Sequence, residues 1–157
     1  MEHSITIDDE AAIQALDVMR RRRGSGDKLL AWRDGRRWRD LDAAQVNDYI
    51  KATTGLDATA KDFRTWHATV IAAAALASTD EPGHTKASRK RAVSATMKEV
   101  AEFLGNTPTL ARTAYVDPRV VEAYEHGRTI RVPGDYDSAD ARQAALERAV
   151  LRLLKDS

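Results

Sequence analysis

Apolar residues in the middle of the chain recur at helical spacing and predict two long helices. The segment from near Thr85 to Leu104 has inward-facing positions three or four residues apart, at Val93, Met97, Val100 and Leu104. Gly105 is expected to end this helix. A second helix is expected from Thr59 to about Ser78, and its far end is apolar all round, which predicts a central, buried helix.

Shorter helices are indicated by their start signals. Thr107-Pro108 and Asp117-Pro118 each combine an N-cap side chain with a proline at the first helical position. The first of these helices carries Tyr115, and the second is expected to end at Gly127. Ser138 is expected to cap a last helix, after a loop over 128–136.

The first 55 residues predict smaller elements. Residues 5–7 (Ile-Thr-Ile) alternate as a brief strand, and a helix should follow from Asp8 or Asp9 to a Gly-Ser-Gly stop at 24–26. Residues 29–38 suggest a small hairpin or extended loop with its turn at 33–36, before a helix from Asp42 to Gly55. The expected fold is therefore mainly α with a minor β hairpin or strand near the N-terminus.

Composition narrows the class of protein. A chain of 157 residues with 43% hydrophobic and 31% charged residues is typical of one soluble domain, taken here as 1–157. The absence of cysteine excludes disulfides and thiolate metal sites, and the four histidines are too scattered to predict a metal site. No apolar run approaches the roughly 20 residues of a membrane span, and no secretory signal is present, so we expect a cytoplasmic protein. No cofactor is expected.

Basic residues are clustered although the net charge is only +1. Residues 20–39 carry nine Lys or Arg and only two acidic residues, both Asp. A second cluster (Lys86, Arg89, Lys90 and Arg91) lies at the start of the later long helix. Such clusters attract phosphates. A solvated surface is the alternative, and for the arginines at 20–23 so is a favourable interaction with a helix C-terminus.

Two motifs carry the strongest functional signal. Tyr115 lies in the run Leu-Gly-Asn-Thr-Pro-Thr-Leu-Ala-Arg-Thr-Ala-Tyr-Val-Asp-Pro-Arg (104–119), about fifty residues after the run Lys-Asp-Phe-Arg-Thr-Trp-His (61–67). Together they resemble the catalytic domain of type IB DNA topoisomerases, in the compact form of bacteria and poxviruses. The resemblance covers nearly the whole chain and implies the helical fold of DNA breaking-rejoining enzymes.

The resemblance also implies a site. Tyr115 would be the nucleophile that forms a 3′-phosphotyrosyl link, and Arg64 would match the second of the family's two active-site arginines. A guanidinium offers a planar fork to phosphate oxygens. Asn106 stands where many relatives have a histidine, and its amide keeps a hydrogen-bond donor without a charge. The resemblance implies an isomerase that relaxes DNA supercoils without ATP or metal. It also implies a monomer that acts on double-stranded DNA in the nucleoid.

The family's other two catalytic groups, a first arginine and a lysine general acid, would align before Met1. By this resemblance we expect a C-terminal catalytic domain that lacks the upstream DNA-clamp domain and part of the active site, with little activity alone.

Two other functions fit parts of the pattern. One is a helical DNA-binding module without chemistry, in which Tyr115 and Arg64 are ordinary packed or surface residues. The other is a tyrosine site-specific recombinase, because Arg64 and His67 have an Arg-x-x-His spacing, although Asn-Thr-Pro and Asp-Pro-Arg favour the topoisomerase. Taken alone, His67 is a structural residue, and Trp32 and Trp38 are core or interface anchors rather than base-stacking platforms.

Overall fold

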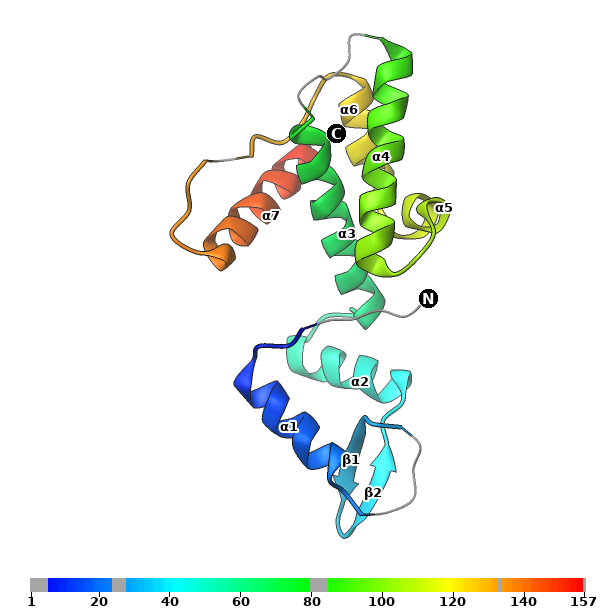
Figure 1. The fold of residues 1–157 in the computed structure, drawn as a ribbon, viewed down its shortest axis with the longest axis vertical. Helices are drawn as coiled ribbons and strands as arrows, with labels where there is room; N and C mark the ends of the chain where they lie inside the picture. Colours follow the sequence, from blue (N-terminus) through cyan, green and yellow to red (C-terminus); the bar gives the residue numbers. More distant parts are fainter. Residues whose placement is uncertain (1–5, 24–27, 80–84, 133, 157) are drawn as a thin grey trace. The chain divides into compact units, whose positions relative to one another are not determined.

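The computed structural model describes residues 6–23, 28–79, 85–132 and 134–156. The chain divides into two units, Met1–Ala60 and Lys61–Ser157 (Figure 1). The mainly helical fold with a small hairpin near the N-terminus is confirmed. Within the described ranges, none of the helices combines the length and apolar character that a bilayer crossing requires.

The first unit consists of a helix, a hairpin and a second helix: α1 (Glu10–Arg20), β1 (Ala31–Asp34), β2 (Arg37–Asp40) and α2 (Ala43–Thr54). Both helices begin where the sequence predicts, because Asp9 and Asp42 accept hydrogen bonds from the first-turn amides. Asp42 and Gln45 bond reciprocally as a capping box. Gly55 ends α2 in the left-handed conformation, with φ of 68°.

The hairpin pairs β1 and β2 in antiparallel register, with Ala31 opposite Asp40. Gly35 has φ of 59° and opens the two-residue turn between the strands, a position where glycine avoids the steric cost of a side chain. The predicted strand at 5–7 is wrong for Thr6 and Ile7, which lie in irregular backbone; the described sheet holds only β1 and β2 and offers this segment no partner. Ile5 and the predicted stop at 24–26 lie outside the described residues.

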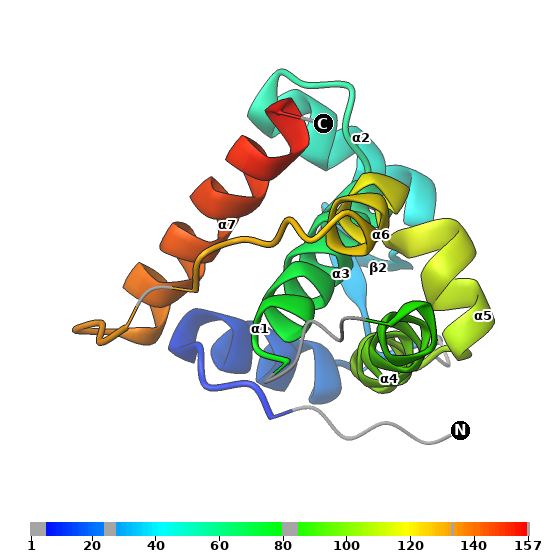
Figure 2. The same ribbon diagram turned by 90° about the horizontal axis from the view of Figure 1, so that it is seen from above.

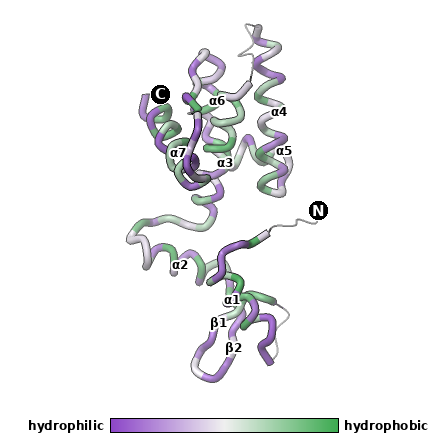
Figure 3. Tube along the Cα trace, turned by 60° about the vertical axis from the view of Figure 1, so that its left-hand side comes forward, coloured by the Kyte–Doolittle hydropathy of each residue, from purple (hydrophilic) through white to green (hydrophobic). Residues whose placement is uncertain are grey.

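Arg22 joins parts of the first unit through hydrogen bonds. Its guanidinium donates to the carbonyl oxygens of Met19 (3.1 Å) and Leu29 (2.6 Å), and it also bonds Lys28. Its side chain is only 7% exposed and lies 3.7 Å from Asp40. One arginine of the predicted basic cluster therefore holds the end of α1 to the hairpin instead of facing solvent. Much of the hairpin itself is hydrophilic (Figure 3).

The second unit is helical: α3 (Ala60–Ala77), α4 (Lys86–Leu104), α5 (Pro108–Leu110), η1 (Ala111–Tyr115), α6 (Pro118–Glu125) and α7 (Ala139–Lys155). The predicted caps Thr107, Asp117 and Ser138 accept hydrogen bonds from the amides of the helices that follow them, and so does Thr85 at the start of α4. Seen from above, α3 lies with α4, α6 and α7 around it (Figure 2).

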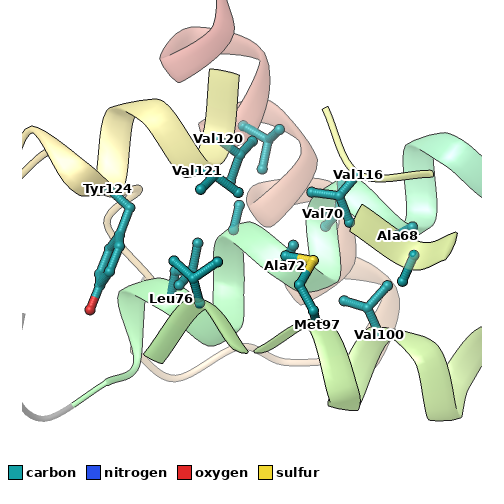
Figure 4. Packing of buried hydrophobic residues seen from close by; sticks show 14 of the residues in the cluster. Ala68, Val70, Ala72, Leu76, Met97, Val100, Val116, Val120, Val121 and Tyr124 are labelled. Atoms are coloured by element: carbon teal, nitrogen blue, oxygen red, sulfur yellow. The ribbon is translucent and has the colours of Figure 1, made fainter. Parts of the chain in front are cut away.

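The core of the second unit forms around the latter part of α3. Buried side chains of α3 meet residues of α4 and α6 (Figure 4), and they include Ala68, Val70, Ala72, Leu76, Met97, Val100, Val120, Val121 and Tyr124. The prediction of a central, buried helix is confirmed for this part. It is wrong for the first turns, where Phe63 is 48% exposed. Those turns carry Arg64 and leave it accessible.

Candidate active site

Tyr115 ends a short π-helix. The backbone N–H of Val116 donates to the carbonyl of Ala111 at 2.9 Å, five residues back, so the helix that starts at Pro108 widens before it stops. Val116 is extended and ends the turn. Single π turns are uncommon and occur often at functional sites. The sequence predicts the helix start at Thr107-Pro108 but gives no signal for this wider turn.

Arg64 lies over the ring of Tyr115. Its guanidinium carbon is 5.5 Å from the ring centroid, within the range of a cation–π contact. One N–H of the same guanidinium donates to the carbonyl oxygen of Leu104 at 2.9 Å. Leu104 is the last residue of α4, and a helix C-terminus favours a cation. The structure therefore brings together two residues that lie 51 positions apart in the sequence.

Asn106 occupies the same end of α4 as the Leu104 carbonyl. It follows Gly105, whose φ of 69° ends the helix, and its backbone N–H donates to Ala101 at 2.8 Å. The side-chain Nδ2 is buried and has no hydrogen-bond partner in the described part of the chain. A buried donor left unpaired costs about 1–3 kcal/mol, so such a group is a candidate for bonding a ligand.

Thr69 anchors the segment that follows Tyr115. Its side chain is 2% exposed, and its Oγ1 accepts from the Asp117 N–H at 3.1 Å. The hydroxyl proton can point to the Thr65 carbonyl at 2.8 Å or to the Tyr115 carbonyl at 3.4 Å, and the shorter distance favours Thr65. Thr69 was not predicted to belong to the site; its only signal in the sequence is a polar side chain among the apolar residues of the predicted buried helix.

Asp117 and Arg119 fix the start of α6 directly after Tyr115. The Asp117 carboxylate accepts from the Arg119 backbone N–H at 2.9 Å and from its guanidinium at 2.7 Å. The hydrogen bonds from Arg119 hold the pKa of Asp117 below its usual value, against the opposing effect of partial burial. Arg119 also donates to the Leu154 carbonyl at 3.2 Å, which ties α6 to the end of α7.

Other residues singled out from the sequence make none of these contacts in the described part of the chain. His67 is exposed on α3, three residues after Arg64 and thus on the same side of the helix. Trp32 is 40% exposed in the first unit. Among the residues that the structure describes, no three His, Asp or Glu side chains gather as a set of metal ligands.

The arrangement has the components of phosphoryl transfer without a metal. A phenol supplies a nucleophilic oxygen, a guanidinium supplies charge and paired donors, and a buried amide supplies a further N–H. Donors fixed in place before a phosphate arrives lower the barrier, because they need no reorganisation as charge develops on its oxygens.

A family model described as eukaryotic DNA topoisomerase I, catalytic core, matches residues 1–130. The match includes Arg64, Asn106 and Tyr115 and stops before α7. Comparison with curated proteins gives no match.

Proposed function

The chain belongs to the family of the eukaryotic DNA topoisomerase I catalytic core, and from this membership we propose that it is a type IB enzyme whose nucleophile is Tyr115. DNA is its substrate, and the reaction changes DNA topology by cutting, swivelling and resealing one strand.

In the proposed reaction the Tyr115 oxygen attacks a backbone phosphorus. A bond forms between this oxygen and phosphorus, the bond from phosphorus to the 5′ oxygen breaks, and the strand leaves with a 5′-hydroxyl once that oxygen gains a proton. The phenol proton passes to solvent as the attack proceeds, and the 5′ oxygen takes its proton from solvent. The 5′-hydroxyl then attacks the 3′-phosphotyrosyl link, restores the strand and releases the phenol. The phosphodiester energy is conserved in the covalent link, so the cycle requires no ATP, and the Arg64 guanidinium supplies the positive charge that a metal ion would otherwise bring.

The observation that carries this proposal is the position of Arg64 over the Tyr115 ring. A guanidinium has five N–H donors, and the bond to Leu104 uses one. A phosphate placed at the phenol oxygen would therefore lie near a cation that α3 and the end of α4 already orient. Asn106, with its buried and unpaired Nδ2, would donate to a second phosphate oxygen.

Further details belong to the same proposal. The substrate is double-stranded DNA, the enzyme acts as a monomer associated with the nucleoid, and its type is the compact one of bacteria and poxviruses. The asparagine at position 106 supports this type, because some bacterial members have asparagine in place of the histidine of other relatives.

The test is a covalent adduct on a duplex nicked so that the cut strand end diffuses away. We expect a DNA-linked protein with the wild-type chain and with Tyr49→Phe, whose side chain is 70% exposed in the first unit, but not with Tyr115→Phe. Label on the 5′ side of the cut should stay with the protein, which identifies a 3′-phosphotyrosyl bond. An adduct that survives Tyr115→Phe would contradict the assignment.

Two outcomes would point to the other functions. Salt-sensitive binding without any adduct, unchanged by Tyr115→Phe, would indicate a DNA-binding module. An adduct confined to one DNA site, with strand exchange between duplexes, would indicate a recombinase.

A further inference from the structure

The second unit also has a basic groove, whose lining does not include Tyr115. The first half of α4, the end of α6 and one side chain of η1 enclose a groove of about 510 Å³. Its lining residues are Lys86, Arg89, Lys90, Val93, Arg112, Glu125 and His126. Tyr115, Arg64 and Asn106 are not among them, so the catalytic proposal does not account for this groove.

The charges of the groove are unbalanced. Among the residues that the structure describes, four cationic side chains line it with one carboxylate, that of Glu125. Lys86 and Lys90 are exposed and lie one helical turn apart on α4, and neither has a hydrogen bond or ion pair within the described ranges. Like charges held side by side raise the local potential and attract anions.

The walls of the groove are fixed by internal contacts. Arg89 donates a hydrogen bond to the carbonyl oxygen of Glu125, which joins α4 to the end of α6. The Nδ1 of His126 lies 2.7 Å from the Glu122 carbonyl, so the ring is held as well. Val93, 2% exposed, is the buried apolar residue of the lining. Cationic side chains in fixed positions suit the phosphates of a phosphodiester backbone. The apolar part of the lining suits its sugars, which are less polar than the phosphates.

Arg112 connects the groove with the nucleophile segment. It precedes Tyr115 by three residues on η1 and also lines a neighbouring hollow of about 260 Å³ together with Val116. Along α4, Lys90 lies fourteen residues before Leu104, which corresponds to about 21 Å of helix. For a duplex whose axis runs along α4, at about 3.4 Å per nucleotide, that length spans roughly six phosphates of one strand.

We propose that this groove binds backbone phosphates of the DNA substrate, several nucleotides away from the phosphate that Tyr115 attacks. The choice of DNA as the ligand rests on the proposed function. Lys86 and Lys90 bind the phosphates, and Arg89 keeps the groove in shape.

The test compares two double variants that each remove two positive charges. Lys86→Gln/Lys90→Gln alters the groove, whereas Arg148→Gln/Arg152→Gln removes two exposed charges from α7 outside it. The dissociation constant of each protein is measured by fluorescence anisotropy over a salt series, with a duplex that extends past both ends of α4. Thermal melting by circular dichroism checks that every variant is folded.

We expect the slope of log K against log salt to become shallower by about 1.8 for the groove variant, because each lost phosphate contact contributes about 0.9. The control variant should keep the wild-type slope. Equal loss in the two variants, or no loss in either, would overturn the proposal.

A second measurement separates this inference from the catalytic proposal. With the nicked duplex, the groove variant should need more DNA for half-maximal adduct formation and reach the wild-type rate at saturation. A lower rate at saturation would show that the groove contributes to the reacting phosphate and would overturn its assignment to distant phosphates. A difference in slope without any adduct, in any variant, would support the groove and contradict the assignment of Tyr115.

Discussion

Replacing Thr69 by valine should loosen the segment that carries Tyr115. Valine keeps the size and branching of threonine but removes the hydroxyl that accepts from the Asp117 N–H at 3.1 Å. The Thr65 carbonyl also loses a bond, but it lies within α3 and keeps its place in the helix. The perturbation is thus confined mainly to the junction after the nucleophile.

The magnitude follows from the donor that is left without a partner. An unpaired N–H in a partly buried position costs about 1–3 kcal/mol. For a chain of 157 residues, each kcal/mol lowers Tm by about 2–4 °C. Catalysis should suffer separately, because a shift of about 1 Å in a reacting group can cost roughly 100-fold in rate.

The assay compares Thr69→Val with Thr69→Ser. Serine restores the hydroxyl and loses only a methyl group from a side chain that is 2% exposed. Melting temperature and the rate of adduct formation at saturating DNA are measured for both. We expect both variants to melt below wild type, but only the valine variant to form the adduct much more slowly.

Equal adduct rates for valine, serine and wild type would refute the role of Thr69 in holding Tyr115. Equal losses for valine and serine would assign the effect to packing in the core rather than to the hydroxyl.

Three further predictions concern the same end of α4 and the residues after Tyr115. Asn106→His should introduce a step near about pH 6.5 in the adduct rate that the wild-type protein lacks, because imidazole titrates there and an amide does not; a wild-type step in that range would contradict the role of Asn106. Asp117→Asn should lower Tm slightly at neutral pH. Arg119 lowers the folded-state pKa of Asp117, so this contribution is present above the unfolded value of about 3.9 and is lost as the pH falls through the folded value; a Tm difference that persists at lower pH would count against it. Gly105→Ala should cost about 1 kcal/mol or more in denaturant unfolding, because the residue has φ of 69°, and it should slow adduct formation by moving Asn106; unchanged stability would argue against this cap.

The helices of this fold could be predicted from local signals. Asp42, Thr85 and Thr107 each combine a capping side chain with a following helical pattern, and all three cap helices in the structure. A cap requires only contacts within a few residues. The prediction of a strand was wrong at Thr6 and Ile7 for the opposite reason, since strand pairing depends on a distant partner that a short apolar alternation does not specify.

The site shows the same division between local and distant contacts. Arg64, Asn106 and Tyr115 were selected by motif resemblance, and the structure places Arg64 against Tyr115; their catalytic roles stay predictions. The π turn, the anchoring bond of Thr69 and the internal use of Arg22 depend on side chains that meet only after folding. No periodicity or spacing in the sequence carries that information.

The central claim is that Tyr115 attacks a DNA phosphate with help from Arg64 and Asn106. None of these three residues is suited to protonate the leaving oxygen. The Tyr115 oxygen bonds the phosphorus, an arginine stays charged, and an asparagine carries no acidic proton. A duplex with sulfur in the 5′-bridging position isolates the claim, since a thiolate leaves without a general acid.

The most direct measurement is the rate of covalent adduct formation on this sulfur duplex, beside the ordinary oxygen duplex and with Tyr115→Phe as the control. The account predicts an adduct on the sulfur duplex that depends on Tyr115 and forms faster than on the oxygen duplex. No adduct on either duplex, or an adduct that persists in Tyr115→Phe, would contradict it.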